Sequence, residues 1–367
     1  MGGVGRGWKT NPQNFFTDHG PRLLKILILK PSSLGDVVQA LPVLRLIKRR
    51  HPASEIYWWI ETSLAPLLEG DPDLAGVIPF DRKRWASPPH WPALWRNLRW
   101  LRAQQFDWVI DLQSLARSGA FAWLANGKFL IGLDDAREGA RGYYDVIVPR
   151  ASRLTHAVDW YLSVLPPLGV PVEKDFDWLP SRPAVAASLG EKWGAQWDGT
   201  RWILFHPGAR WDNKCWPVER FAELARELSR DGSVRLAVLG GAADRALGAA
   251  ITAAAPGACL DLTGQTTLPE MIEWVRLGEL LITNDTGPMH VAAALGRPVV
   301  GIFGPTEPAR TGPYGQTKSA LQSLHLPCVP CLKSHCAYEK PMECLRAITP
   351  ERVLAEVRRR LVVPAPE

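Results

Sequence analysis

The sequence has no hydrophobic run of the length that a membrane-spanning helix needs, about 20 residues. Residues 1–21 lack the apolar core of a secretory signal and are Gly-rich and polar, so we expect a disordered extension there and no signal peptide. The sequence also has no short-period repeat, no nucleic-acid-binding motif and no dense block of Lys and Arg. These absences argue against membrane-spanning, secreted and nucleic-acid-binding proteins, and they predict a cytoplasmic location.

The composition is that of a soluble globular protein. With 367 residues, 46% hydrophobic and 22% charged, the chain is long enough for two domains that each have a core. The net charge of +6 favours an anionic substrate or an anionic surface as partner, without choosing between them.

Two successive series of short apolar strands alternate with helices. We expect strands at residues 25–30, 55–61, 77–80, 107–113, 128–133 and 145–148, and then at 202–206, 234–239, 259–262, 279–283 and 299–303. The clearest helices are expected at 36–50, 150–168, 218–230, 244–254, 268–277, 288–295 and 351–361. This alternation predicts an α/β protein with two tandem Rossmann-like domains, whose parallel sheets are covered on both faces.

The domain boundary is expected in the Pro-rich and charged stretch from residue 166 onwards. We therefore divide the chain into domains at residues 22–180 and 181–349, followed by a C-terminal helix and tail at 350–367. A cleft between the carboxyl edges of the two sheets is the default ligand site in such a fold.

The stretch from 279 to 306 combines two buried strands with a helix that follows a small polar turn. Asp285, Thr286 and Gly287 form the turn, and His290 falls within the first turn of the helix. Backbone N–H groups and the positive end of the helix would converge there, which predicts a phosphate site. The alternative is an ordinary turn followed by a packed histidine.

Similar loops follow the first strand of each series. In the first, Asp36 is either a simple helix-capping residue or a carboxylate at the sheet edge that accepts a proton. The polar or small residues expected on the acceptor side are Lys30, Ser32, Ser33 and Gly35. In the second loop, small residues and cations are suited to a diphosphate, although a single loop lysine is often only a surface charge. These donor-side candidates are Gly208, Ala209, Arg210 and Lys214.

Three motifs together resemble glycosyltransferase family 9, which includes the ADP-heptose:lipopolysaccharide heptosyltransferases. They are GDVVQALPVLRLIKRRHP, HPGARWDNKCWP and NDTGPMHVAAALGRPVVGIFGPT, and the resemblance extends from residue 25 to about 361. It implies a GT-B architecture, with an acceptor-binding first domain and a nucleotide-sugar-binding second domain. It also implies inverting, metal-independent transfer of heptose from ADP-L-glycero-D-manno-heptose to the inner core of lipopolysaccharide, a Kdo/heptose-lipid A acceptor, at the inner face of the inner membrane.

The resemblance also implies roles for individual residues. Asp36 matches the catalytic base, and Lys214 matches the lysine that contacts the donor phosphates. The residues that match the turn and helix holding the diphosphate and sugar are Asp285, Thr286, Gly287 and His290. Some relatives have hydroxyl residues before the lysine, where this chain has Gly208, Ala209 and Arg210.

The segment from Trp85 to Phe106 is rich in Trp and Arg. Its side chains of interest are Trp85, Trp91, Trp95, Trp100, Arg96, Arg99 and Arg102. We expect a helix packed on the sheet with its Trp at core spacing; the alternative is a face that contacts an anionic membrane or a lipid-linked acceptor.

Four cysteines lie close together near the C-terminus, with spacings x2, x4 and x7. Cys328, Cys331, Cys336 and Cys344 could hold a structural zinc, with His335 as a substitute ligand. Because the spacing is not that of paired zinc knuckles, we expect reduced thiols that pack a loop. The resemblance implies that transfer itself requires no metal or other cofactor.

Other functions remain open. A family 9 enzyme with another sugar nucleotide or glycan acceptor would need the same residues. A GT-B-fold nucleotide-sugar epimerase would convert the donor without an acceptor, and a non-catalytic glycan-binding protein would not need Asp36, Lys214 and the 285–290 turn together.

Overall fold

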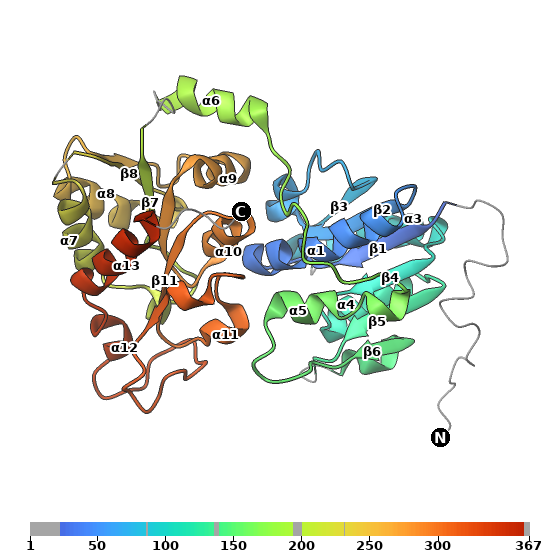
Figure 1. Cartoon of the computed structure of the whole chain (residues 1–367). Helices are drawn as coiled ribbons and strands as arrows, with labels where there is room; N and C mark the ends of the chain where they lie inside the picture. The colour runs from blue at the N-terminus through green and yellow to red at the C-terminus, as the bar shows by residue number, and fades with distance from the viewer. Residues whose placement is uncertain (1–22, 86, 136–138, 194–199, 231, 363–367) are drawn as a thin grey trace. The chain divides into compact units, whose positions relative to one another are not determined.

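The computed structural model describes residues 23–85, 87–135, 139–193, 200–230 and 232–362. Within them, one compact unit contains residues 23–32, 40–151 and 159–176, and a second contains 33–39, 152–158 and 177–362 (Figure 1). The extension expected at 1–21 lies outside the described residues. None of the helices in the described ranges has the length and apolar character to span a bilayer.

The first unit contains a six-stranded parallel sheet of order β3-β2-β1-β4-β5-β6. Its strands are β1 (Lys25–Leu29), β2 (Glu55–Glu61), β3 (Gly76–Phe80), β4 (Trp108–Asp111), β5 (Phe129–Leu133) and β6 (Val146–Val148). Its helices are α1 (Leu34–Arg50), whose first turns belong to the second unit, α2 (Arg82–Trp85), α3 (Trp91–Ala103), α4 (Ala116–Leu124) and α5 (Ala157–Leu162). Short 3₁₀ turns are η2 (Thr62–Leu67), η3 (Pro88–His90), η4 (Ala140–Tyr143) and η5 (Pro166–Leu168).

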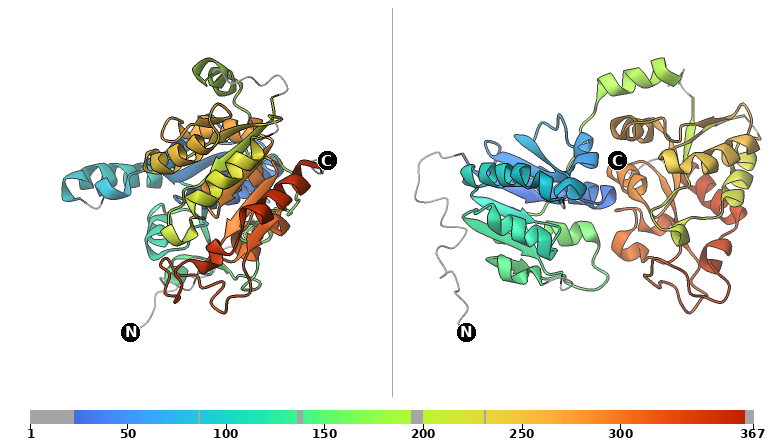
Figure 2. Two further views of the ribbon diagram at one scale, coloured as in Figure 1. Left: turned by 90° about the vertical axis from the view of Figure 1, so that its left-hand side faces the viewer. Right: turned by 180° about the vertical axis from the view of Figure 1, so that it is seen from behind.

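The second unit repeats this topology, with a six-stranded parallel sheet of order β12-β11-β10-β7-β8-β9 (Figure 2). Its strands are β7 (Trp202–His206), β8 (Arg235–Val238), β9 (Cys259–Asp261), β10 (Leu280–Asn284), β11 (Val299–Phe303) and β12 (Ala320–Gln322). Its helices are α6 (Pro183–Trp193), α7 (Val218–Leu228), α8 (Arg245–Ala254), α9 (Leu268–Leu277), α10 (Gly287–Ala294), α11 (Pro308–Thr311), α12 (Glu343–Arg346) and α13 (Pro350–Val362), and its 3₁₀ turns are η6 (Asp212–Lys214), η7 (Ala242–Asp244) and η8 (Thr317–Ser319).

Apolar strands buried on both faces hold each unit together, as expected for parallel sheets. Every residue of β7, β10 and β11 is buried. In the second unit, Val353 and Val357 of α13 pack in the same core as Ile282 and Val300, so the last helix is part of that core. The strand order reverses between β1 and β4 and between β7 and β10, which makes the loops after these strands the expected ligand sites.

The two predicted parallel sheets are confirmed, and the predicted strands coincide with observed ones to within two residues at each end. The short edge strand β12 was not predicted. The helix expected over 150–168 is wrong, because α5 begins only at Ala157. Before it, the backbone N–H of Ser152 bonds the side chain of Thr155, and such local bonds compete with helix formation. After it, Pro166 and Pro167 cannot continue an α-helix.

Candidate functional site

The reversal point of the second sheet lies between β7 and β10, where His206 pairs with Thr283. The side chain of Asn284, which has no exposed surface, joins the two loops that follow. Its Nδ2 donates to the carbonyl oxygen of Pro207 at 2.6 Å, and its Oδ1 accepts from the backbone N–H of Trp216 at 3.0 Å. One buried amide therefore fixes the loop that carries Lys214 against the turn that carries Asp285.

Replacing Asn284 with leucine is expected to destabilise the second unit by about 2–5 kcal/mol, because two buried backbone groups lose their partners. The urea midpoint should fall without a large change in the slope of the unfolding transition. Gln265→Leu is the control, since it removes one amide hydrogen bond at the surface. Equal stability of the two variants would contradict the role given to Asn284.

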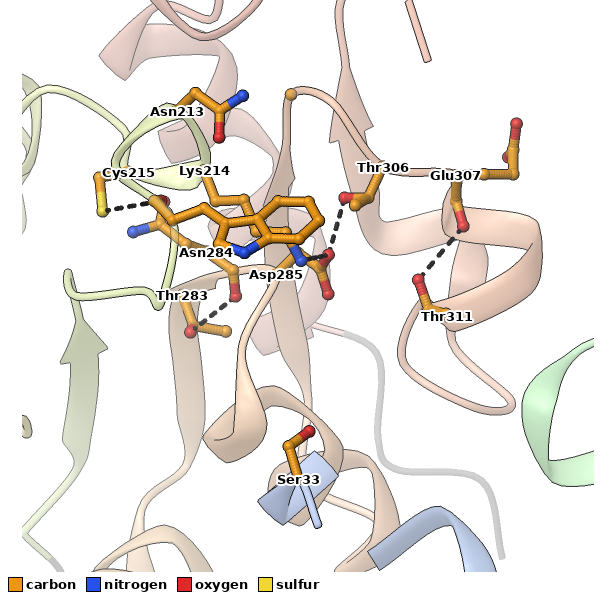
Figure 3. Close-up of polar contacts among 12 residues, drawn as sticks. Ser33, Asn213, Lys214, Cys215, Thr283, Asn284, Asp285, Thr306, Glu307 and Thr311 are labelled. Atoms are coloured by element: carbon orange, nitrogen blue, oxygen red, sulfur yellow. Dashed lines mark hydrogen bonds and ion pairs between the residues drawn. The ribbon is translucent and has the colours of Figure 1, made fainter. Parts of the chain in front are cut away.

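Lys214 and Asp285 form an ion pair at the site. The Nζ atom of Lys214 lies 2.6 Å from Oδ2 of Asp285, and Thr306 donates its hydroxyl to the same oxygen at 2.7 Å (Figure 3). The side chains of Lys214 and Asp285 are 18% and 7% exposed. Lys214 also lies over the ring of Trp211, with 4.8 Å between Nζ and the ring centroid. The ammonium group is thus held by contacts with Asp285 and Trp211, and Thr306 supports the carboxylate of the ion pair.

Helix α10 begins at Gly287, directly after this ion pair. Thr286 precedes the helix in an extended conformation, and Pro288 occupies its first turn, where no N–H is needed. A Cβ on Gly287 would press against the side chain of Leu34, so the position requires a small residue. The unpaired N–H groups of a helix start make it a suitable site for an anion.

His290 lies in the first turn of α10 and is 8% exposed. Burial lowers its pKa to about 4; the nearby carboxylates of Asp285 and Asp36 act in the opposite direction, whereas His156 and Lys214 lower it further. The imidazole is therefore neutral at pH 7, and it can bind a ligand by hydrogen bonding but not as a cation.

The low pKa of His290 makes folding stability depend on pH. An unfolded histidine has a pKa near 6.5, so the unfolded chain binds the proton more tightly than the folded one. The free energy of unfolding is highest in this respect above pH 6.5. It falls by about 3 kcal/mol as the pH drops from 6.5 to 4. His290→Gln should therefore lose less stability than the wild type between pH 7 and pH 4.5 in denaturant titrations. Identical pH dependence of the two proteins would contradict a buried, neutral His290.

Gly208 allows its loop to pack closely against the side chain of Asp244. A Cβ there would overlap the carboxylate of Asp244, which accepts from the backbone N–H of Gly241 at 2.7 Å. Gly208 and Ala209 are not among the residues that line the pocket described below, whereas Arg210 is. Gly208 was expected to contact the donor. In the structure, its missing side chain allows the loop to pack against Asp244.

Asp36 lies in the first turn of α1, in the part of that helix that belongs to the second unit. Its Oδ2 accepts from the backbone N–H of Ser33 at 3.0 Å and from the Ser33 hydroxyl at 2.8 Å. The carboxylate therefore caps α1, and it also faces a pocket. A Cβ on Gly35 would overlap the ring of His290, so only glycine fits there.

Lys30 was expected to offer a polar group on the acceptor side, but its side chain is buried. It is 3% exposed, and its Nζ donates to the carbonyl oxygen of Leu112 at 3.1 Å and lies over the ring of Tyr161. Ser32 is half-buried and, like Lys30, does not line the pocket. These two residues support the loop before α1.

One pocket of the second unit, with a volume of about 580 Å³, brings most of the predicted residues together. They are Ser33, Gly35, Asp36, Arg210, Lys214, Asp285, Thr286, Gly287 and His290. Sequence reasoning missed others that line it, including Gln39, His206, Trp211, Gly240, Gly241, Thr266, Thr267, Leu268, Met271, Thr306 and Thr311. Gly240 and Thr266 come shortly after β8 and β9, and this position at strand carboxyl ends is the signal that could have identified them. The volume is within the range of small-molecule sites.

The four clustered cysteines are free thiols that line a separate small pocket. Burial raises the pKa of Cys344 to about 11, and the neighbouring cysteines add to this. Across the described part of the chain, no group of three or more His, Cys, Asp or Glu is arranged to hold a metal ion. His335, the suggested substitute ligand, is exposed.

The expectation of core spacing for the Trp-rich segment is wrong for three of its four tryptophans, those on α3. Trp85 packs against Phe80 and Phe121, but Trp91, Trp95 and Trp100 are 51%, 63% and 42% exposed. The helix α3 is buried through Leu98 and Leu101 instead.

Known proteins resemble the chain over most of its length. The family described as glycosyltransferase family 9 (heptosyltransferase) matches residues 93–342. Lipopolysaccharide heptosyltransferase 1 of Pseudomonas aeruginosa is 31% identical, over 93% of this chain and 99% of its own. The structure of a family 9 glycosyl transferase from Veillonella parvula aligns with a TM-score of 0.77 at 25% identity, covering 92% of this chain and 97% of its own. E. coli heptosyltransferase WaaC with ADP-2-deoxy-2-fluoro heptose aligns with a TM-score of 0.72 at 25% identity, covering 92% and 99%.

Proposed function

The chain belongs to glycosyltransferase family 9 and has the GT-B fold, and from that premise we propose that it transfers heptose from ADP-L-glycero-D-manno-heptose to the inner core of a lipid-linked lipopolysaccharide acceptor. The observation that carries the proposal is one pocket that contains the ion-paired Lys214, the start of α10 and the carboxylate of Asp36. A relative has been solved with a fluorinated ADP-heptose, which supports the choice of donor.

The diphosphate of the donor would lie between Lys214 and the first turn of α10. Negative charge builds on this group as the sugar leaves, and a fixed ammonium and backbone N–H groups can stabilise it. We propose that these groups supply the positive charge, so that transfer needs no divalent metal. Because Lys214 is already paired with Asp285, a diphosphate would share the ammonium with that carboxylate.

The nucleoside would occupy the part of the pocket farther along the sheet edge. Gly240 and Gly241 after β8 allow close approach of a flat base. Leu268 and Met271 offer apolar contacts, and Thr267 begins helix α9 beside them. This combination of apolar surface and a few polar groups is typical of nucleoside binding.

Asp36 would act as the base. In the proposed step, the acceptor hydroxyl gives its proton to the carboxylate of Asp36 while its oxygen attacks C1 of the heptose. The bond from C1 to the β-phosphate oxygen breaks, its electron pair leaves with ADP, and the configuration at C1 inverts. Ser33 donates two hydrogen bonds to Oδ2 of Asp36 and so fixes the orientation of the carboxylate.

The acceptor would determine where in the cell the enzyme works. A lipid-linked acceptor would require the enzyme to work at the cytoplasmic face of the inner membrane, as a peripheral protein. The net charge of +6 supports contact with phosphorylated, anionic material.

Calorimetric titration with a panel of nucleotides and sugar nucleotides tests the choice of donor. We expect ADP and ADP-heptose to bind more tightly than UDP, GDP and their sugars, in the presence of EDTA as in its absence. Preference for a UDP- or GDP-sugar would keep the transferase and reject the heptose donor. Donor conversion without any acceptor would favour the epimerase.

A further inference from the structure

We propose that the exposed face of helix α3 docks on anionic phospholipid, so that the enzyme reaches its acceptor at a bilayer surface. The docking face is defined as Trp91, Trp95, Trp100, Arg96, Arg99 and Arg102. The proposal rests on the proposed function in one respect, the lipid-linked acceptor. It adds the surface of the protein that meets the lipid.

All six side chains of the docking face are exposed. In a 13-residue helix they cover about half of the circumference over a length of roughly 20 Å. The opposite half contains Leu98 and Leu101, which enter the core of the first unit together with Phe106. Because leucines hold the helix on the sheet, the exposed tryptophans are not needed to anchor it.

Three exposed tryptophans on one short helix are unusual for a surface that meets only water. Trp91 and Trp95 are more than half exposed, and the ring of Trp100 meets that of Tyr57 edge to face, with the ring centroids 5.9 Å apart. Indole rings favour the headgroup level of a bilayer, where an apolar ring and a polar N–H can both be accommodated.

The charge of this region matches an anionic bilayer. From Arg82 to Ala103 the sequence contains no Asp or Glu. Two further exposed arginines, Arg82 and Arg84 of α2, precede the docking face. Basic residues beside tryptophans on one helix face are the pattern of an interfacial helix, and each adds attraction to anionic lipid. A second copy of the same face would bring arginine against arginine, which disfavours self-association through it.

The topology puts α2 and the start of the docking face near the carboxyl edge of the first sheet, the proposed acceptor side. Helix α2 follows the carboxyl end of β3, and in a parallel sheet the loop after β1 emerges from the same edge. That loop leads to Ser33 and Asp36. A bilayer against α2 and α3 would therefore present headgroup-level sugars to the edge that carries the proposed base.

Co-sedimentation with vesicles tests the proposal in the full-length protein. We expect binding to phosphatidylglycerol-containing vesicles at low salt, weaker binding at high salt and little binding to pure phosphatidylcholine. The double variants Trp91→Ala/Trp95→Ala and Arg96→Glu/Arg99→Glu should each bind the anionic vesicles on the order of tenfold more weakly. The matched controls Trp123→Ala, at a 45% exposed tryptophan on α4, and Arg358→Glu, at an exposed arginine on α13, should bind like the wild type.

Unchanged binding by both double variants, or equal loss in the controls, would overturn the proposal. So would sedimentation velocity data in which the wild type is a dimer and the double variants are monomers, because the face would then be a contact between copies. Transfer to a de-acylated, water-soluble acceptor should be unchanged in the double variants, while transfer to a vesicle-embedded acceptor should fall. If the wild type transfers no heptose but binds vesicles through α3, the proposed function fails and the docking face stands.

Discussion

Asp36→Asn is expected to slow heptose transfer by about 10²–10⁴-fold, the usual contribution of a general base. The asparagine oxygen can still accept both hydrogen bonds from Ser33, so the cap of α1 is retained. An amide cannot take the proton of the acceptor hydroxyl, so kcat should fall while the dissociation constant of the donor stays within about twofold. Steady-state kinetics and calorimetry measure the two quantities separately.

Ser33→Ala is the matched control for this variant. It removes the hydroxyl that bonds Oδ2 of Asp36 at 2.8 Å but keeps the carboxylate and the backbone hydrogen bond. A loss of about tenfold or less in kcat is expected, since one hydrogen bond contributes about 1 kcal/mol. If Asp36→Asn transfers heptose at the wild-type rate, Asp36 is only a helix cap.

Lys214→Ala is expected to weaken ADP binding on the order of a hundredfold, because it removes a cation and leaves a carboxylate next to the diphosphate. Asp285 is 7% exposed, so its charge would remain poorly solvated. Calorimetric titration with ADP measures the effect. Arg201→Ala is the control. It breaks an exposed ion pair with Glu279 at the amino ends of β7 and β10, whereas the site lies at their carboxyl ends.

The double variant Lys214→Ala/Asp285→Asn separates the two causes of this loss. It removes the unpaired carboxylate as well, so it should bind ADP more tightly than Lys214→Ala alone. Equal affinity of wild type and Lys214→Ala would remove the lysine from the donor site. Equal affinity of the single and double variants would show that the charge of Asp285 has no effect there.

Local sequence signals were sufficient to predict the sheets and the loops that carry the site. Strands β7, β10 and β11 each contain a continuous apolar run, and polar residues follow the run where these parallel strands end. Because the strands are parallel, the loop with Lys214 and the turn with Asp285 had to meet at one edge. Their meeting could therefore be expected before the ion pair was known.

Contacts between distant residues could not be read from local patterns. Asn284 looked like a turn residue, yet its amide binds Pro207 and Trp216, which lie 77 and 68 positions away. His290 was expected as either a ligand contact or a packed histidine, and only the structure shows the burial that makes its imidazole neutral. The tryptophans of α3 were predicted to form its buried face. In the structure, the smaller leucines of this helix pack in the core instead.

A single transfer reaction tests the central claim most directly. The purified protein would be incubated with ADP-heptose and a Kdo-lipid A acceptor in EDTA, and the products followed by mass spectrometry and by NMR of the new anomeric centre. We expect one heptose added per acceptor, release of an equal amount of ADP, inverted configuration at C1 and almost no product from Asp36→Asn. Loss of ADP-heptose without modified acceptor, or transfer only from a UDP- or GDP-sugar, would contradict the proposed heptose transfer.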